Sequence, residues 1–96
     1  MRNRTVTSSA DAVFSALSDP TRREILELLR SGPRTSGEIA DKFSTSWPTI
    51  SRHLSVLKDA GLILAERNGQ QVVYELNTTV FQDVVESLIK WLKPRR

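Results

Sequence analysis

Apolar residues follow a helical spacing along most of this chain, with one interruption before the last twenty residues. The first apolar stripe predicts a short helix over residues 9–17. It consists of Val13, Phe14 and Leu17. Asp19 and Pro20 predict the start of a second helix, because aspartate caps helix N-termini and proline fits the first helical position. Gly32-Pro33 is expected to end that helix.

Two further helices are predicted next, over residues 35–44 and 46–59. Thr35 and Glu38 have the spacing of a capping box, in which each residue satisfies a backbone N–H of the other. Pro48 is tolerated in the first turn of the later helix. Apolar residues at i, i+4 and i+7 mark one buried face of that helix. They are Ile50, Leu54 and Leu57.

The spacing then changes to that of β-strands. Gly61 is expected to close the preceding helix, and strand-like runs follow at 62–64 and 72–76. Asn68-Gly69 lies between the runs and is the dipeptide preferred in two-residue hairpin turns. The pattern predicts a β-hairpin.

A last helix is predicted to start after Asn77-Thr78-Thr79 and to run to about Leu92. The expected order is therefore four helices, a hairpin and a final helix. We expect a single domain over the 96 residues, mainly α in class (α+β). Residues 1–8 are expected to be a flexible N-terminus, and 93–96 a basic tail.

Two short helices joined by a tight polar turn, with a hairpin directly after them, indicate a winged helix-turn-helix. In this architecture the second helix of the pair enters the major groove of B-DNA, with its N-terminal residues at the base edges. Here that helix is 46–59, and its polar side is expected to face DNA. The DNA-facing residues predicted on that side are Ser46, Trp47, Thr49, Ser51, Arg52 and His53.

Arg52 is the main candidate for a base or phosphate contact, since a guanidinium binds guanine or phosphate through two hydrogen bonds. No acidic residue lies between Asp41 and Asp59, so a polyanion would meet no repulsion there. Trp47 is either a core aromatic or a DNA-facing one. His53, the only histidine, is either held by hydrogen bonds within the protein or bound to phosphate.

Further DNA contacts are predicted outside that helix. The hairpin tip carries a cation and several amides, which suit the minor groove or phosphates, although a plain polar turn is the alternative. One of Arg22 and Arg23 is expected to contact phosphate and the other to pair with Glu24 or Glu27; we assign the DNA contact to Arg22. The remaining predicted DNA-binding residues are Thr35, Arg67, Asn68 and Gln70.

The last helix is apolar over a wider face than one small core needs. A chain of 96 residues is only marginally stable alone, so this surplus suits a twofold interface with a second copy. A thicker monomer core, or a cavity for a small molecule, is the alternative. The predicted interface residues are Val13, Phe14, Leu17, Val80, Val84, Leu88 and Trp91.

Composition narrows the function classes further. Hydrophobic residues make up 39% of the chain and the formal net charge is +3, as in an ordinary folded protein. The chain has no cysteine, no secretory signal pattern and no apolar stretch of the roughly 20 residues that a membrane span needs, so we expect a cytoplasmic protein. Because its one histidine lies on the predicted DNA face, without a carboxylate cluster or glycine-rich phosphate loop, we expect neither an enzyme nor a cofactor.

Three segments resemble the ArsR (ArsR/SmtB) family of bacterial repressors. They are Leu-Ser-Asp-Pro-Thr-Arg-Arg-Glu-Ile-Leu-Glu-Leu-Leu at 17–29, Ser-Arg-His-Leu-Ser-Val-Leu-Lys-Asp-Ala-Gly-Leu-Ile at 51–63 and Gly-Gln-Gln-Val-Val-Tyr-Glu-Leu at 69–76. The resemblance covers about residues 10–92, and the junction at 76–80 is similar to the SdpR-type autorepressor branch. It implies a homodimer joined through the first and last helices, bound to a partly palindromic DNA operator until a signal releases it. It also implies that the recognition-helix segment contains Ser46, Trp47, Pro48, Thr49, Ser51, Arg52 and His53, which adds Pro48 to the predicted DNA-binding residues.

The chain departs from the metal-sensing members of that family. Those members hold metal with a cysteine pair before the recognition helix, or with Asp, His and Glu on the last helix. This chain has no cysteine, and its last helix offers only Asp83 and Glu86. We therefore expect no metal site, and control by a non-metal signal, by protein level or by a protein partner. Two alternatives stay open: a ligand-sensing repressor with a pocket near the last helix, and a winged helix that binds protein or RNA.

Overall fold

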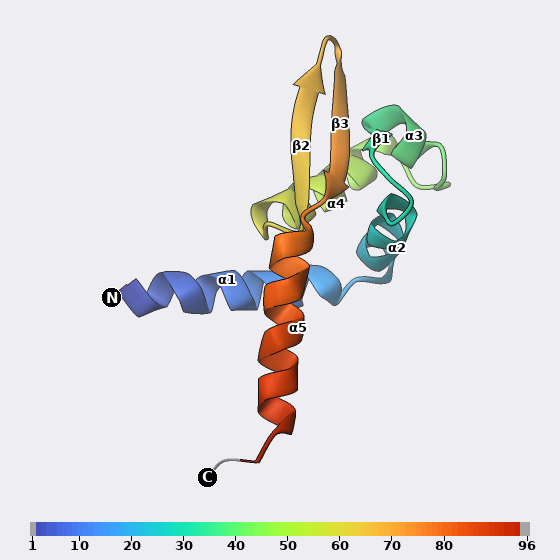
Figure 1. Cartoon of the computed structure of the whole chain (residues 1–96). Coiled ribbons are helices and arrows are strands. Elements are labelled where there is room, and N and C mark those ends of the chain that lie inside the picture. The colour runs from blue at the N-terminus through green and yellow to red at the C-terminus, as the bar shows by residue number, and fades with distance from the viewer. Residues whose placement is uncertain (1, 95–96) are drawn as a thin grey trace.

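The computed structural model describes the backbone of residues 2–94 and the side chains of residues 10–94. Within that range it contains five helices and a small antiparallel sheet (Figure 1). In chain order the elements are α1 (Arg2–Leu17), α2 (Pro20–Leu29), β1 (Arg34–Thr35), α3 (Ser36–Ala40), α4 (Trp47–Asp59), β2 (Ile63–Asn68), β3 (Gln71–Leu76) and α5 (Thr78–Leu92). The predicted winged helix-turn-helix is confirmed, with β1 as an additional strand.

The first helix is longer than the apolar pattern predicted. α1 begins at Arg2, whereas the sequence placed its start near residue 9 and a flexible segment before it. No glycine or proline interrupts residues 2–17, so nothing in the backbone stops the helix earlier. At the other end of the chain α5 stops at Leu92; of the predicted basic tail, residues 95–96 lie outside the described residues.

Side-chain caps fix the starts of α2 and α3 as the sequence predicted. Asp19 accepts hydrogen bonds from the backbone N–H groups of Thr21 and Arg22, at 2.8 and 3.2 Å. At α3 the capping box is complete: Thr35 Oγ1 accepts from Glu38 N at 3.1 Å, and Thr35 N donates to Glu38 Oε1 at 2.9 Å. These caps satisfy N–H groups that have no partner inside their helices.

The sheet has the strand order β1-β3-β2, and both pairings are antiparallel. Asn68 pairs with Gln71, so the two-residue turn is Gly69-Gln70 and the predicted Asn68-Gly69 turn is wrong by one position. Gly69 has φ +70°, whereas Gln70, like every described residue other than glycine, does not have a positive φ. Positive φ at the first central residue alone is typical of a type II′ turn, with glycine at that position. β1 pairs with β3 through Arg34 and Thr35 and ties the loop before α3 to the hairpin.

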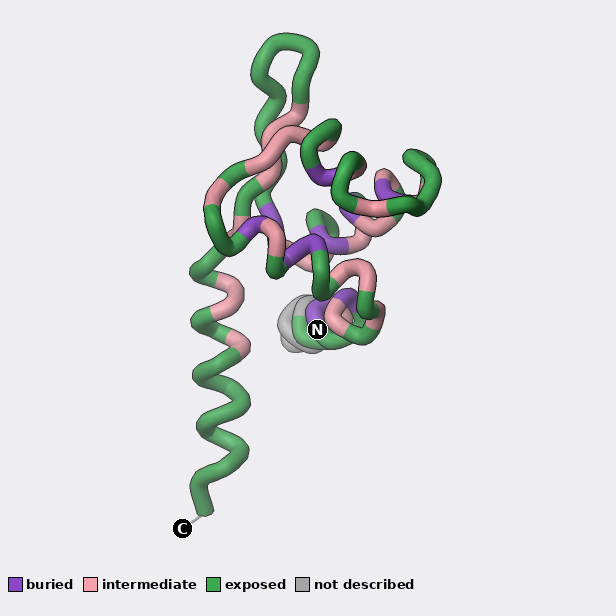
Figure 2. The backbone as a smooth tube through the Cα atoms, turned by 90° about the vertical axis from the view of Figure 1, so that its right-hand side faces the viewer, coloured by how far each residue is buried: buried purple, intermediate pink, exposed green. Residues whose placement is uncertain are grey.

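The core lies where α1, α2, α3, α4 and β2 meet (Figure 2). Its largest fully buried side chains are Ile25, Ile39, Ile50, Leu54, Leu57, Leu62 and Ile63. The predicted inward row of α4 is therefore confirmed. α5 has no buried residue; it leaves the body of the molecule after β3, and its C-terminal half is exposed on all sides (Figure 2).

The junction between α4 and β2 is short and fully hydrogen-bonded. Gly61 N donates to Lys58 O at 2.9 Å, and Leu62 N donates to Leu57 O at 3.0 Å, the two bonds of a Schellman motif. Gly61 has φ +81°, which the motif requires and glycine adopts without strain. The next two side chains, Leu62 and Ile63, are buried, so α4 passes directly into the hairpin.

Candidate nucleic-acid interface

The polar side of α4 lies outward, opposite its buried row. Trp47 and Pro48 form the first turn, and Trp47 is 48% exposed, so its core alternative is wrong. The side chain of Ser46, the N-cap residue, makes no hydrogen bond to the helix backbone; its hydroxyl instead lies 3.1 Å from Thr49 Oγ1. The other predicted residues of this face are exposed (Arg52) or half-buried (Thr49, Ser51 and His53).

Arg52 carries an uncompensated positive charge on this face. Among the described side chains no hydrogen bond or ion pair engages it, and no acidic residue lies between Asp41 and Asp59. Lys42 and Lys58, within the same stretch, are also exposed. The sign of the charge and the open N-terminal end of α4 together suit a polyanion.

The guanidinium of Arg22, which the sequence predicted to contact phosphate, is hydrogen-bonded within the protein. Its Nε donates to Ala16 O at 2.8 Å and its Nη2 to Ser15 O at 3.2 Å. Its Nη1 lies 3.2 Å from His53 Nδ1 on α4. These carbonyls belong to the last turn of α1, where carbonyl groups lack helical partners and attract cations. The side chain is directed into the protein and joins the end of α1 to α4.

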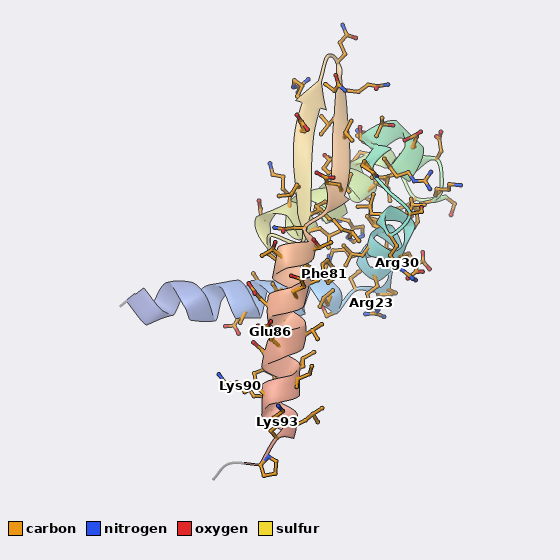
Figure 3. The ribbon with its side chains drawn as sticks, viewed as in Figure 1. Arg23, Arg30, Phe81, Glu86, Lys90 and Lys93 are labelled. Carbon is orange, nitrogen blue, oxygen red and sulfur yellow. The ribbon has the colours of Figure 1, made fainter. Side chains whose placement is uncertain are left out.

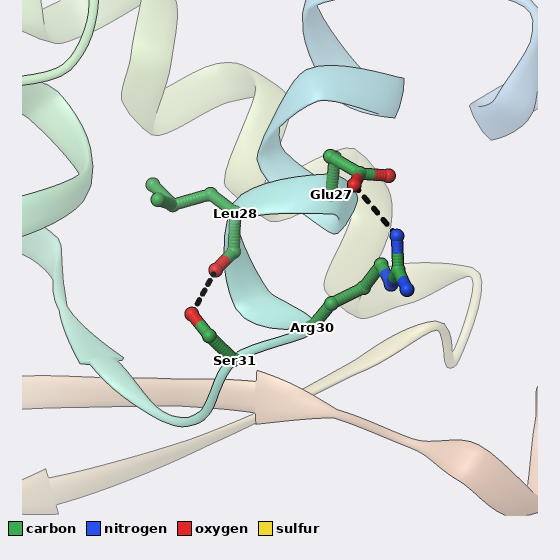
Figure 4. Close-up of polar contacts among 4 residues, drawn as sticks. All are labelled: Glu27, Leu28, Arg30 and Ser31. Carbon is green, nitrogen blue, oxygen red and sulfur yellow. Dashed lines mark hydrogen bonds and ion pairs between the residues drawn. The ribbon is translucent and has the colours of Figure 1, made fainter.

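The expected pairing of Arg23 with Glu24 or Glu27 is also absent. Arg23 Nη1 donates to Leu17 O at 2.7 Å instead, and adds to the cap of α1. The ion pair within the described side chains joins Arg30 Nη1 to Glu27 Oε2 at 2.8 Å, one turn along α2 (Figure 4). Both partners are well exposed, so this pair contributes little to stability.

Asp19 lies next to this arginine group. Withdrawal from water acts to raise the pKa of Asp19, but the backbone N–H groups of Arg22 and Thr21, with the nearby His53 and Arg22 side chains, outweigh it. The pKa of Asp19 therefore lies below its ordinary value. The carboxylate of Asp19 therefore becomes protonated at a lower pH than an ordinary aspartate, and it stays charged as the cap of α2 down to that pH.

The hairpin forms a wing that extends away from the helices (Figure 1). All residues of its tip, 67–71, are exposed, including the predicted contacts Arg67, Asn68 and Gln70. Thr35 lies elsewhere, on β1, where its hydroxyl accepts the capping hydrogen bond from Glu38 N.

α5 presents a large apolar face with no cover in the single chain. Its exposed large apolar residues are Val85, Leu88, Ile89, Trp91 and Leu92. Trp91 and Phe14 of α1 lie with ring centroids 6.3 Å apart, which ties α5 loosely to α1. A charged edge follows the same helix through Glu86, Lys90 and Lys93 (Figure 3).

The residues predicted for a twofold interface fall into three groups in the structure: exposed, buried and half-buried. Phe14, Leu88 and Trp91 are exposed, whereas Val13 is buried in the core. Leu17, Val80 and Val84 are half-buried and pack against that core. Three more apolar residues of the last helix, Val85, Ile89 and Leu92, are also exposed, although they were not among the predicted interface residues.

Two open hollows border α5. One, of about 490 Å³, lies between α1 and α5 and is lined by Phe14, Val84 and Trp91 among others. The other, of about 400 Å³, lies between α2 and the start of α5, with Arg23 and Arg30 on its α2 side and Phe81 on its α5 side (Figure 3). No group of three or more His, Cys, Asp or Glu side chains within the described part of the chain could hold a metal ion. No helix in that part is long and apolar enough to cross a membrane.

Known proteins share both the sequence and the fold. A family model described as "Bacterial regulatory protein, arsR family" matches residues 19–65, from the cap of α2 to the first strand of the wing. The transcriptional repressor SdpR of Bacillus subtilis is 50% identical over 80 residues, which are 83% of this chain and 89% of that protein. The chain belongs to the arsR family. An arsenical resistance operon repressor of Staphylococcus aureus is 33% identical over 79% of this chain and 73% of its own length.

Solved structures of the arsR family have the same architecture. An ArsR-like transcriptional regulator from Rhodococcus superposes with a TM-score of 0.80 at 27% identity, over 90% of this chain and 81% of that one. A homodimeric winged helix-turn-helix DNA-binding domain from Mycobacterium bovis gives a TM-score of 0.74 at 27% identity, over 99% and 92% of the two chains. The resemblance inferred from the three sequence segments is therefore confirmed, and the chain is a regulatory protein rather than an enzyme.

Proposed function

We propose that this member of the arsR family is a transcriptional repressor that binds a partly palindromic DNA operator as a homodimer. We further propose that it represses its own gene and is released by a signal other than a metal ion. One observation carries the proposal: α4 exposes a polar, acid-free face on which Arg52 has no partner within the described chain. Such a regulator acts in the cytoplasm, where bacterial DNA lies.

The DNA contacts of the proposal come from α4 and the wing. α4 enters the major groove from its N-terminal end, with Arg52 at a guanine edge or a phosphate. The wing tip reaches the neighbouring backbone or minor groove. The proposed contacts are Thr35, Ser46, Trp47, Pro48, Thr49, Ser51, Arg52, His53, Arg67, Asn68 and Gln70.

The exposed face of α5, with Phe14 on α1, supports the homodimer, because an apolar patch of this extent is rare on a monomer. The solved M. bovis relative is homodimeric by its description. Twofold symmetry of the protein requires a matching near-palindrome in the operator.

The repressor role rests on relatives, among them SdpR of B. subtilis and the S. aureus arsenical resistance repressor. The absence of cysteine from the chain, together with the lack of a metal-binding cluster in its described part, supports release by something other than a soft metal ion. The likeness to the SdpR branch at residues 76–80 supports the proposed repression of its own gene.

The direct test selects binding duplexes from a random DNA library and measures their affinity by fluorescence anisotropy. Arg52→Ala should weaken binding by about 1–3 kcal/mol without unfolding the protein. Arg30→Ala is the matched control, since Arg30 is an exposed arginine outside the proposed interface. Equal effects of the two variants, or selected duplexes without twofold symmetry, would contradict the proposal. Footprinting upstream of the chain's own gene tests autorepression separately.

A second candidate is a repressor that a small molecule releases, and the hollow between α1 and α5 favours it. A ligand there would contact Phe14, Val84 and Trp91, at the same face as the proposed dimer. A library of apolar compounds, scored by Trp91 fluorescence and by loss of the DNA complex, tests this candidate. Compounds that change the fluorescence and leave DNA bound would count against it.

A further inference from the structure

We infer that Arg22 and His53 act as one positioning unit: the Arg22 guanidinium holds the recognition helix α4 against the end of α1 and fixes the tautomer of His53. This inference rests on the proposed DNA binding and deepens it. Arg22 then controls DNA affinity without touching DNA, although its sequence position at the start of α2 suggested a direct phosphate contact.

The three nitrogens of the Arg22 side chain reach two different helices. Two of them donate to α1, at Ser15 O and Ala16 O, and the third reaches His53 Nδ1 on α4 at 3.2 Å. Arg22 itself lies in the first turn of α2, where its backbone N–H donates to the capping carboxylate of Asp19. A planar guanidinium with donors in a fixed fork can span these groups, whereas the single ammonium of lysine cannot. One side chain thus connects three helices at the base of the proposed DNA face.

The contact also determines which nitrogen of His53 carries the proton. A guanidinium has only donors, so His53 Nδ1 must accept and must be unprotonated. The proton of the neutral ring then resides on Nε2, which can only donate. A phosphate oxygen can only accept, so this tautomer is the one that suits a DNA backbone. Two charged residues lie near the His53 ring, Arg22 and Asp19, and both lie at the start of α2.

Position along the chain explains why this pair matters for reading DNA. His53 follows Arg52 directly, on the polar side of α4, and is half-buried rather than exposed. Loss of the Arg22–His53 contact would therefore remove a link between the end of α1 and the turn of α4 that presents Arg52. Small displacements of a binding group from its required geometry cost affinity even when the group itself is intact.

A double-mutant cycle on the full chain tests the unit. Arg22→Gln, His53→Gln and the double variant are titrated by anisotropy with a duplex selected by the wild-type protein, over a range of salt concentrations. Each single variant should bind about tenfold more weakly, equivalent to about 1.4 kcal/mol, and the double variant no more weakly than the weaker single one. Arg23→Gln, which loses only a bond to Leu17 O, is the matched control and should stay within about twofold.

A direct phosphate contact gives a different result. In that case the two single effects multiply in the double variant, and Arg22→Gln lowers the slope of log affinity against log salt by about one. Either outcome overturns the inference while leaving the proposed function intact. A wild-type protein that selects no duplex would instead overturn the proposed function.

A measurement on the wild-type protein covers the case in which Arg22→Gln does not fold. The ¹⁵N–¹H correlation pattern of the His53 imidazole near neutral pH should show the Nε2–H tautomer. The Nδ1–H tautomer, or rapid exchange between the two, would overturn the inference without any variant.

Discussion

Replacement of Leu88 by serine should weaken the dimer without unfolding the protomer. Leu88 is 43% exposed in the single chain and belongs neither to the buried core nor to the side chains packed against it. Burial of a whole leucine side chain is worth roughly 1.5–3 kcal/mol, so covering this exposed part is worth about 1 kcal/mol. A twofold interface contains each residue twice, so the loss per dimer is about 2 kcal/mol, or about thirtyfold in Kd.

Sedimentation equilibrium over a wide range of protein concentration measures that Kd. Leu64→Ser is the matched control, because Leu64 is a leucine of similar exposure, 48%, on β2 of the wing. We expect the control to keep the wild-type Kd and Leu88→Ser to shift to monomer. Equal Kd values for Leu88→Ser and wild type, or a wild-type protein that is monomeric throughout, would refute the assignment of this face to the dimer.

Three further predictions concern DNA binding and acid stability. The affinity for DNA should fall steeply as salt rises, because phosphate contacts release counterions; an affinity independent of salt argues against a DNA ligand. In a gel-shift assay zinc, cadmium and arsenite should each leave the complex intact, and release by any of them would show a metal site that the residues do not suggest. Asp19 has a lowered pKa in the folded protein, so its contribution to stability is full above the ordinary aspartate value and is lost as pH falls through the folded pKa. Urea unfolding of Asp19→Asn, which can cap without titrating, should therefore depend less on pH in the acidic range, and identical profiles for the two proteins would contradict this cause.

Local signals in the sequence predicted where α2, α3 and α4 begin, whereas α1 begins seven residues before its predicted start and α3 ends at Ala40, before the predicted residue 44. Asp19-Pro20 and the pair Thr35 and Glu38 act through hydrogen bonds a few residues away, so their spacing alone carries the information. The inward row of α4 was predictable for the same reason, since one helical period identifies it.

Features that depend on contacts distant in sequence were not predictable. β1 is two residues long and exists only because β3 pairs with it, so it has no alternation of its own. The turn shifted to Gly69-Gln70 because the register of the whole hairpin decides it. The role of Arg22 depends on a residue 31 positions away, and an arginine in a first helical turn reads equally well as a surface charge.

The closed junction between α4 and β2 has a consequence for the geometry of DNA recognition. The backbone hydrogen bonds of Gly61 and Leu62 and the burial of Leu62 and Ile63 hold the junction, so we expect the proposed recognition helix and the wing to move together. In the proposed complex, a half-site with a different spacing between groove and wing contacts would then have to adjust through the DNA. The length of DNA that each protomer covers would depend on residues 60–62, which lie outside the proposed DNA contacts.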